Sequence, residues 1–265
     1  MPDAEAGREL VALSPTARAL TARAPLHFAH IVVMGGGCYG SWYTQQLVRA
    51  MSRGALTAAR VDVVDQDAAC PVATRWREGE YAGWPVHVVT ESWTSYLARW
   101  WSAGPDALAG HAMVPSPLMP HLCFEWLLER ARLRWPGREV RAEPLRTAPP
   151  TPWERAAPDL RHYVSFATWM CPVNCVEPAR CPATRGPRDW SMPLAMQQFA
   201  DSDPSLDAAV IFPCVHRTYG VGMIDVAPIV AADAALAERG ASGPFRALVG
   251  TVSHCHGALG VLSVS

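Results

Sequence analysis

Three cysteines lie in one proline-rich segment of the chain, spaced Cys-x3-Cys-x5-Cys. They are Cys171, Cys175 and Cys181, and a proline directly follows the first and the third. The prolines of this segment exclude a regular helix or strand, so we expect the thiols to lie on a loop. In a reducing compartment such a cluster points to metal binding or catalysis rather than to disulfides.

The spacing of these cysteines favours an iron–sulfur cluster over zinc. Structural zinc sites usually use Cys-x2-Cys knuckles, which direct two thiolates at one tetrahedral ion. Iron–sulfur clusters accept irregular cysteine loops, and ferredoxin runs also place a proline after a ligand cysteine. We therefore predict a cluster, of the 4Fe–4S type, on the three cysteines, with Cys255 or Cys214 as the distal ligand. Zinc, and a loop without any metal, are the alternatives.

Two further groups of ligand-type side chains follow buried apolar stretches of the sequence. Cys214 and His216 end one stretch, and His254, Cys255 and His256 end another. Open parallel sheets bind ligands beyond the carboxyl ends of their strands. If these strands are parallel, the two groups and the cysteine segment meet at one rim of a sheet.

A glycine-rich turn supplies a second kind of chemistry. The apolar run 31–34 has the length of a buried strand, and Gly35, Gly37 and Gly40 follow it in the order G-x-G-x-x-G. An amphipathic helix comes next and ends near Gly54. A second strand then ends at Asp65.

This first segment resembles the Rossmann-type dinucleotide-binding superfamily over about residues 28–67. The resemblance implies a pyrophosphate over the glycine turn and the helix N-terminus, with an acidic residue that accepts hydrogen bonds from the ribose. The cofactor would be NAD(P) or a flavin nucleotide. The residues that the resemblance assigns to it are Gly35, Gly37, Cys38, Tyr39, Gly40 and Asp65.

Together these features predict an α/β protein with one doubly wound, mostly parallel Rossmann-like sheet and a cysteine-rich metal-binding loop. We expect residues 1–26 to form an N-terminal arm or helix and residues 27–143 to form the nucleotide-binding half. Residues 144–265 would form a second α/β half on the same sheet, and this half would carry the Cys/His cluster.

Composition excludes several classes of function. The chain has 265 residues, a formal charge of −1 and no lysine, so all 23 basic residues are arginine. Walker-type phosphate loops and Schiff-base enzymes need a lysine and are excluded. The near-neutral charge gives no sign of a basic surface that would bind nucleic acid. We also find no secretory signal and no apolar run of membrane-spanning length, so we expect a cytoplasmic protein.

The sequence favours an oxidoreductase that couples the dinucleotide to an iron–sulfur centre. The candidate general acids are Tyr39, Tyr219, His216 and His254, because each is predicted at the same rim. A zinc-dependent enzyme on the same scaffold, and a non-enzymatic redox or metal sensor or accessory protein, are the alternatives. The expected partners are the dinucleotide and a redox protein, and the sequence leaves a homo-oligomer open.

Overall fold

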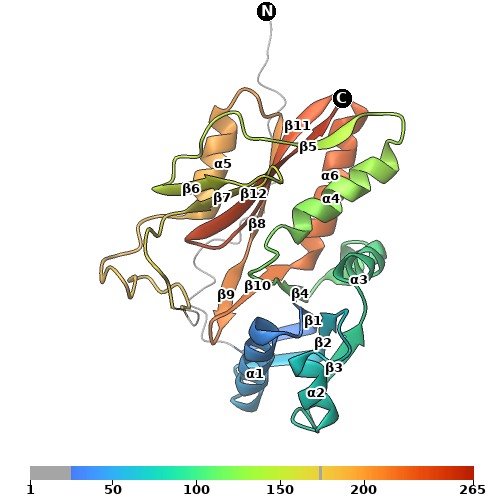
Figure 1. The fold of residues 1–265 in the computed structure, drawn as a ribbon, viewed down its shortest axis with the longest axis vertical. Helices are drawn as coiled ribbons and strands as arrows, with labels where there is room; N and C mark the ends of the chain where they lie inside the picture. Colours follow the sequence, from blue (N-terminus) through green and yellow to red (C-terminus); the bar gives the residue numbers. More distant parts are fainter. Residues whose placement is uncertain (1–24, 173–174) are drawn as a thin grey trace, which may run out of the picture.

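The described chain forms two β-sheets, one in the upper and one in the lower half of the view in Figure 1, with helices around them. The structure is a computed structural model that describes residues 25–172 and 175–265. The predicted N-terminal arm, residues 1–26, therefore lies outside the described residues except for its last two. None of the helices within the described ranges is long and apolar enough to cross a membrane.

The first sheet has a parallel part and an antiparallel extension. Its six strands run in the order β3-β2-β1-β4-β10-β9. The first four are parallel to one another, and β10 pairs antiparallel with both β4 and β9. The strands are β1 (Leu26–Met34), β2 (Leu56–Asp65), β3 (Val86–Thr90), β4 (His111–Val114), β9 (Val215–Thr218) and β10 (Val221–Asp225).

Helices cover both faces of the first sheet because its central strands are apolar on both sides. α1 (Cys38–Ser52) and α2 (Pro71–Arg77) pack on the face that carries Ile31 and Val63. α3 (Trp93–Trp100) packs on the opposite face, against Val32 and Val64. Consecutive residues of a strand point to opposite faces, so the unbroken apolar runs of β1 and β2 require a helix on each side.

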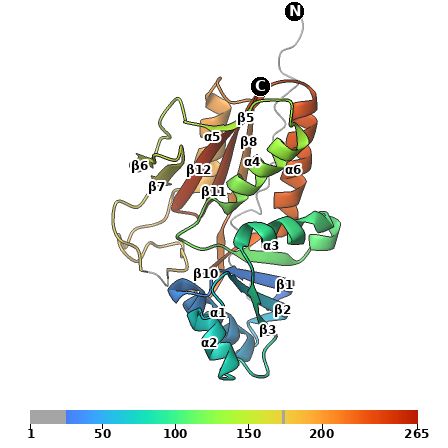
Figure 2. The ribbon, with the colours of Figure 1, turned by 45° about the vertical axis from the view of Figure 1, so that its right-hand side comes forward.

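The second sheet is mostly antiparallel, in the order β6-β7-β12-β11-β8, with β5 also paired to β12. Only β8 and β11 run parallel among its described strands. α4 and α6 lie together on one face and α5 on the other (Figures 1 and 2). These elements are β5 (Val140–Glu143), β6 (Trp153–Ala156), β7 (His162–Ser165), β8 (Ala208–Pro213), β11 (Phe245–Val252), β12 (His256–Val264), α4 (Leu122–Arg134), α5 (Met192–Ser202) and α6 (Val226–Ala241).

One apolar core joins the two sheets. It contains Val32 and Met34 from the first sheet and Val249 and Leu262 from the second, and all four are buried. α4 and α6 lie between them and contribute to the same core. The two sheets are therefore held against each other by shared apolar burial, the dominant favourable term in folding.

The predicted single, doubly wound and mostly parallel sheet is wrong, because the described residues form two mixed sheets. The physical reason lies in two hairpins. Tyr219 and Gly220 both have positive φ, at 44° and 79°, which closes a two-residue turn between β9 and β10. β11 likewise turns back into β12. The first sheet also takes strands from both sides of the predicted boundary at residue 143, because β9 and β10 complete it.

The glycine turn between β1 and α1 is held by close backbone contacts. Gly36 N–H donates to Asp65 Oδ2 at 2.7 Å, which ties the turn to the end of β2. A Cβ atom on Gly40 would lie 1.8 Å from the carbonyl oxygen of Gly35, whereas a Cβ atom on Gly37 would have no neighbour within 4 Å. Gly40 is thus required for α1 to start directly above the turn.

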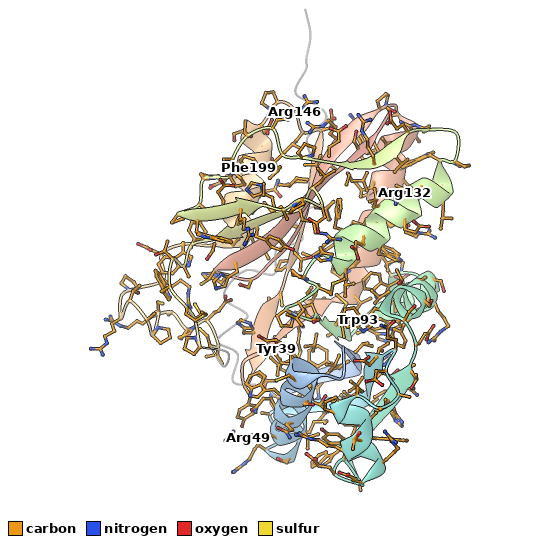
Figure 3. All side chains as sticks on the ribbon, in the orientation of Figure 1. Tyr39, Arg49, Trp93, Arg132, Arg146 and Phe199 are labelled. Carbon is orange, nitrogen blue, oxygen red and sulfur yellow. The ribbon has the colours of Figure 1, made fainter. Side chains whose placement is uncertain are left out.

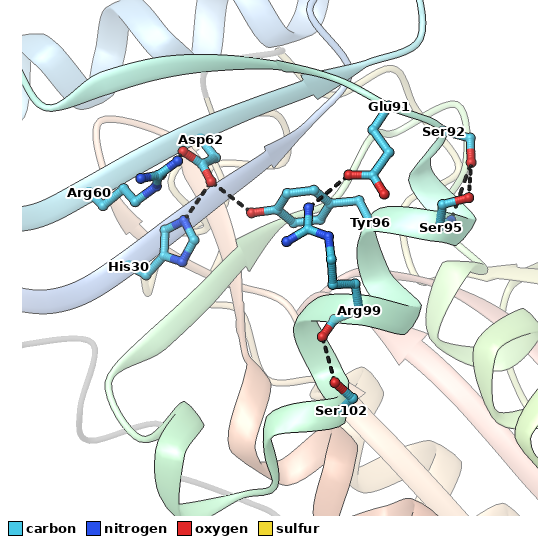
Figure 4. Close-up of polar contacts among 9 residues, drawn as sticks. All are labelled: His30, Arg60, Asp62, Glu91, Ser92, Ser95, Tyr96, Arg99 and Ser102. Atoms are coloured by element: carbon cyan, nitrogen blue, oxygen red, sulfur yellow. Dashed lines mark hydrogen bonds and ion pairs between the residues drawn. The ribbon is translucent and has the colours of Figure 1, made fainter.

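A buried carboxylate joins the first two strands to α3 (Figure 4). Asp62 is 3% exposed, and it accepts hydrogen bonds from Arg60 Nε at 2.7 Å and from Tyr96 Oη at 2.8 Å. His30 Nε2 lies 3.1 Å from the same carboxylate. Burial by itself raises the pKa of Asp62, but His30, Tyr96 and Arg60 outweigh it and bring the pKa below its usual value.

We predict that Gly40→Ala destabilises the fold and that Gly37→Ala does not. The first substitution forces backbone atoms apart, so the free energy of unfolding should fall by about 2 kcal/mol or more. The second adds a methyl group in open space, so the loss should stay below about 1 kcal/mol. Urea denaturation of both variants measures the difference, and equal losses would contradict the packing described for Gly40.

We predict that Asp62→Asn lowers the free energy of unfolding by about 2 kcal/mol at pH 7, because it weakens a buried charge-assisted network. The folded-state pKa of Asp62 lies below the unfolded value of about 3.9. Its stabilisation is therefore complete above about pH 4 and disappears as the pH falls through the folded-state pKa. Urea denaturation from pH 7 to pH 3 should show the two proteins converging at the acid end; a constant difference would argue against the assignment.

Candidate functional site

The predicted cysteine segment is an irregular loop between β7 and α5. We call residues 166–191 the cysteine loop. Its described part holds one isolated bridge, between Arg180 and Pro187, and otherwise no ladder. In Figures 1 and 2 the loop reaches from β7 toward β9 and the start of α1. Its shape therefore depends on contacts with other elements rather than on a sheet of its own.

Both ends of the cysteine loop are fastened to the turn between β11 and β12. We call Ser253, His254 and Cys255 the hairpin turn. Phe166 N–H donates to the carbonyl of Cys255 at 2.9 Å, and Met192 N–H donates to the carbonyl of His254 at 3.0 Å. The turn is therefore the common anchor of the loop's first and last segments.

The middle of the cysteine loop is fastened to the same turn by one carboxylate. Glu177 Oε1 accepts hydrogen bonds from Ser253 Oγ at 2.8 Å and from Cys255 N–H at 3.3 Å, and Oε2 accepts one from His254 N–H at 2.9 Å. The Glu177 side chain is 7% exposed. The turn's N–H groups thus face a buried carboxylate, a charge-assisted arrangement that is stronger than bonds between neutral groups.

Three imidazoles surround the Glu177 carboxylate. Burial lowers the pKa of His216, His254 and His256, while the nearby Glu177 charge opposes that effect and Arg188 adds to it. Neutral imidazoles are therefore favoured at pH 7. His216 Nδ1 approaches Glu177 Oε2 at 3.5 Å. The predicted acids His216 and His254 are thus brought together, and His256 joins them.

Arg188 is the positive charge of this cluster. Its Nη1 donates to the carbonyl of Pro178, and its backbone N–H donates to the carbonyl of Ala179 at 2.8 Å. The guanidinium is among the causes that lower the pKa of Cys181, and it opposes the burial that raises the pKa of Cys255, so it lies near thiols from both the cysteine loop and the hairpin turn. One arginine thereby faces both halves of the site.

The three thiols of the cysteine loop lie close enough to affect one another. Burial raises the pKa of Cys171, and the neighbouring Cys175 and Cys181 raise it further. Cys181 shows the opposite shift, because the backbone N–H of Thr184, with its hydroxyl and the N–H of Ala183, stabilises the thiolate. Glu177 N–H points at Cys175 Sγ at 3.4 Å. Cys181 is therefore more readily ionised than Cys171.

The two distal thiols are buried in different surroundings. Burial raises the pKa of Cys255 to about 11, and Trp190 Nε1 donates to its sulfur at 3.3 Å. Burial raises the pKa of Cys214 to about 12, with the Glu177 charge as a further cause. A Cβ atom on Gly222 would lie 2.8 Å from Cys214 Sγ, so the thiol packs directly on β10.

The expectation of a ready-made metal-binding loop is not met. Among the described residues, no three His, Cys, Asp or Glu side chains are arranged so that they could hold one metal ion. The reason is that the sulfurs have separate partners: Cys181 faces its own turn, Cys255 faces Trp190, and Cys214 faces β10. The iron–sulfur cluster and its zinc alternative stay predictions.

The glycine turn lies near this cluster through α1. Burial raises the pKa of Tyr43 to about 12, and the neighbouring Cys214 and Tyr39 are further causes. Figure 3 shows Tyr39 at the end of α1 that faces the cysteine loop, and Arg49 toward the other end. The Arg49 guanidinium stacks over the Tyr219 ring at 5.3 Å. Tyr39 and Cys214 thus both neighbour Tyr43, whereas Tyr219 contacts Arg49 of the same helix.

The residues assigned to a nucleotide occupy the start of α1 and the end of β2. Gly37 is the N-cap of α1, and Cys38 and Tyr39 in its first turn are exposed. Asp65 already accepts hydrogen bonds from Gly36 N–H at 2.7 Å and from Asp67 N–H at 2.9 Å. Asp65 thus braces the turn in addition to any role toward a ribose.

Sequence reasoning did not identify the central residue of the site. Glu177 is the acidic residue between the second and third cysteines, and that position is the only signal that could have marked it. Its role depends on contact with a turn far along the chain. Ser253 was missed for the same reason: its hydroxyl donates to Glu177 and accepts from Cys255 N–H and His256 N–H, contacts that exist only once the turn has formed.

Residues 123–265 match the model of the AF_1314_C family, which is described as "Uncharacterized protein, C-terminal domain". No curated protein and no solved structure matches the chain. The matched range includes the whole cysteine loop and the hairpin turn, whereas the glycine turn lies outside it. Because the match covers more than half of the chain, the protein belongs to the AF_1314_C family.

Proposed function

We propose that the protein is an oxidoreductase in which a dinucleotide on the glycine turn exchanges electrons with the sulfurs of the cysteine loop. The observation that carries the proposal is the position of α1 between the glycine turn and Cys214. This helix begins at the glycine turn, and its Tyr43 lies beside Cys214, which in turn lies beside Glu177. One helix thus connects the nucleotide candidate to the Cys/His cluster.

The glycine turn has the features that a pyrophosphate needs. The first N–H groups of a helix have no acceptor within the helix, and the helix dipole favours negative charge there. The side chains of Cys38 and Tyr39 are exposed beside those groups. Asp65 ends the strand next to β1, where a ribose hydroxyl would lie beside a pyrophosphate on the turn.

The cysteine loop has the features of a thiol redox centre. The backbone N–H of Thr184 lowers the pKa of Cys181 and so raises its share of thiolate, the nucleophilic form of cysteine, and Cys171 lies near it. Reduction of a disulfide between two such cysteines takes two electrons and two protons and yields two thiols. A reduced nicotinamide or flavin supplies two electrons at once. The same sulfurs are the ligands of the predicted iron–sulfur cluster, which would carry electrons singly.

We predict that anaerobically purified protein oxidises a reduced dinucleotide and that Cys171→Ala abolishes this reaction. The reaction is followed by the loss of nicotinamide absorbance, together with iron, zinc and sulfide analysis and a count of free thiols. Iron and sulfide in matching amounts would place the electrons on a cluster. A gain of two thiols without metal would place them on a disulfide. No electron uptake by the sulfurs would contradict the proposal.

Two variants serve as controls for this measurement. Leu133→Ala truncates an exposed side chain of α4, outside the site, and should leave nucleotide oxidation unchanged. Gly37→Asp places a carboxylate at the N-cap of α1, where it suits the helix but repels a pyrophosphate. Gly37→Asp should weaken nucleotide binding by about tenfold or more without loss of stability. Unchanged binding would place the nucleotide elsewhere.

A further inference from the structure

The hairpin turn and the side chains around it offer more polar atoms than the Glu177 carboxylate binds. Ser253 Oγ, His254 N–H and Cys255 N–H already donate to Glu177. Two further polar atoms of the cluster, His216 Nδ1 and Arg188 Nε, are buried and make no hydrogen bond among the described residues, although His216 Nδ1 lies 3.5 Å from Glu177 Oε2. Buried polar atoms are nearly always paired in native structures, so two unpaired ones beside an anion need an explanation.

The carboxylate that fills this place is delivered by a backbone under strain. Glu177 has φ of 48°, the left-handed region that a residue with a Cβ atom rarely adopts. Strain of this kind collects at binding and switch sites. The loop that carries Glu177 has only one isolated bridge in its described part. A ligand that replaced Glu177 would therefore release strain and would break few backbone hydrogen bonds.

We propose that the hairpin turn is a binding site for the carboxylate group of a small anionic substrate, and that Glu177 is a resident occupant which this substrate displaces. The substrate carboxylate would accept hydrogen bonds from the three donors of the turn. The unpaired His216 and Arg188 nitrogens would bind its second oxygen or a neighbouring polar group. Displacement frees the middle of the cysteine loop, which exposes the buried Cys181 and more of the half-buried Cys171 and Cys175.

This inference names the substrate class of the oxidoreductase site proposed above. It rests on that proposed function only in calling the bound carboxylate a substrate. The binding itself needs neither nucleotide nor turnover. A binding experiment on the resting protein therefore fails or succeeds independently of the redox assay. The two proposals can be overturned separately.

The test measures the labelling rate of Cys171, Cys175 and Cys181 by a thiol reagent, resolved by peptide mass spectrometry. Sodium acetate is the probe, and sodium chloride at equal ionic strength is the reference. In the native protein, acetate should increase labelling of the loop thiols in a saturable way. Labelling of Cys38, which is exposed on α1, should not change and serves as the internal reference.

The variant Glu177→Gly should reverse the effect of acetate. Glycine accepts the positive φ without strain, but the turn loses its occupant. Loop thiols should then react about tenfold faster than in the native protein without acetate, as expected when a locking contact is removed. Acetate should slow that labelling, because it refills the empty site. Asp189→Asn, which removes an exposed carboxylate from the same loop, should behave as the native protein does.

An equal response to acetate and to chloride, or acceleration by acetate in both the native protein and Glu177→Gly, would overturn the proposal. If Glu177→Gly unfolds, the buried Cys70 and Cys123 will also label rapidly. Glu177→Gln then carries the test, since its neutral amide keeps the size of the side chain. Acetate should open the loop of Glu177→Gln at lower concentrations than in the native protein; the same half-saturation, or no opening, would overturn the proposal.

Discussion

The contact between the Glu177 carboxylate and the hairpin turn decides the geometry of the site. The cysteine loop lacks a ladder, so neither a sheet nor a helix fixes where its thiols lie. The turn binds the first, middle and last parts of the loop through its own peptide groups and one hydroxyl. Because the carboxylate is buried, its bonds are strengthened by the low local dielectric, and an unpaired partner there would be costly. The relative placement of the loop cysteines and the three imidazoles therefore follows from the Glu177 carboxylate and one tight turn.

The site lies where the two sheets approach each other, a common place for ligands to bind. Apolar burial along α4 and α6 holds the sheets together and needs no contribution from the polar groups. The same burial sets their protonation states, since desolvation disfavours the charged form of both imidazoles and thiols. Cys181 is the exception because hydrogen bonds within its own turn favour the thiolate. Imidazoles with lowered pKa values, thiols with raised ones and one thiol with a lowered pKa thus coexist within a single cluster.

Local features could be predicted from the sequence, whereas features that depend on distant contacts could not. The strand at 31–34, the glycine turn and the following helix have strong short-range signals, and all are present. The meeting of Cys214 and His216 with the 254–256 group was also predicted, and the strands that precede the two groups, β8 and β11, are parallel neighbours. Tyr219–Gly220 carries no short-range signal of a hairpin turn, because tyrosine is unusual at a position with positive φ. The role of Glu177 exists only once β11 and β12 have formed their turn.

The path of the chain between the sheets has a consequence for biosynthesis. β4 is the last strand of the first sheet's parallel part, and its free side pairs with β10, which is made more than a hundred residues later. Until β10 emerges from the ribosome, β4 has an open, apolar edge of the kind that recruits other strands. Pairings between distant segments also slow folding, because a long loop must close first. The nascent first half of this protein is therefore an expected client of chaperones that shield exposed strand edges.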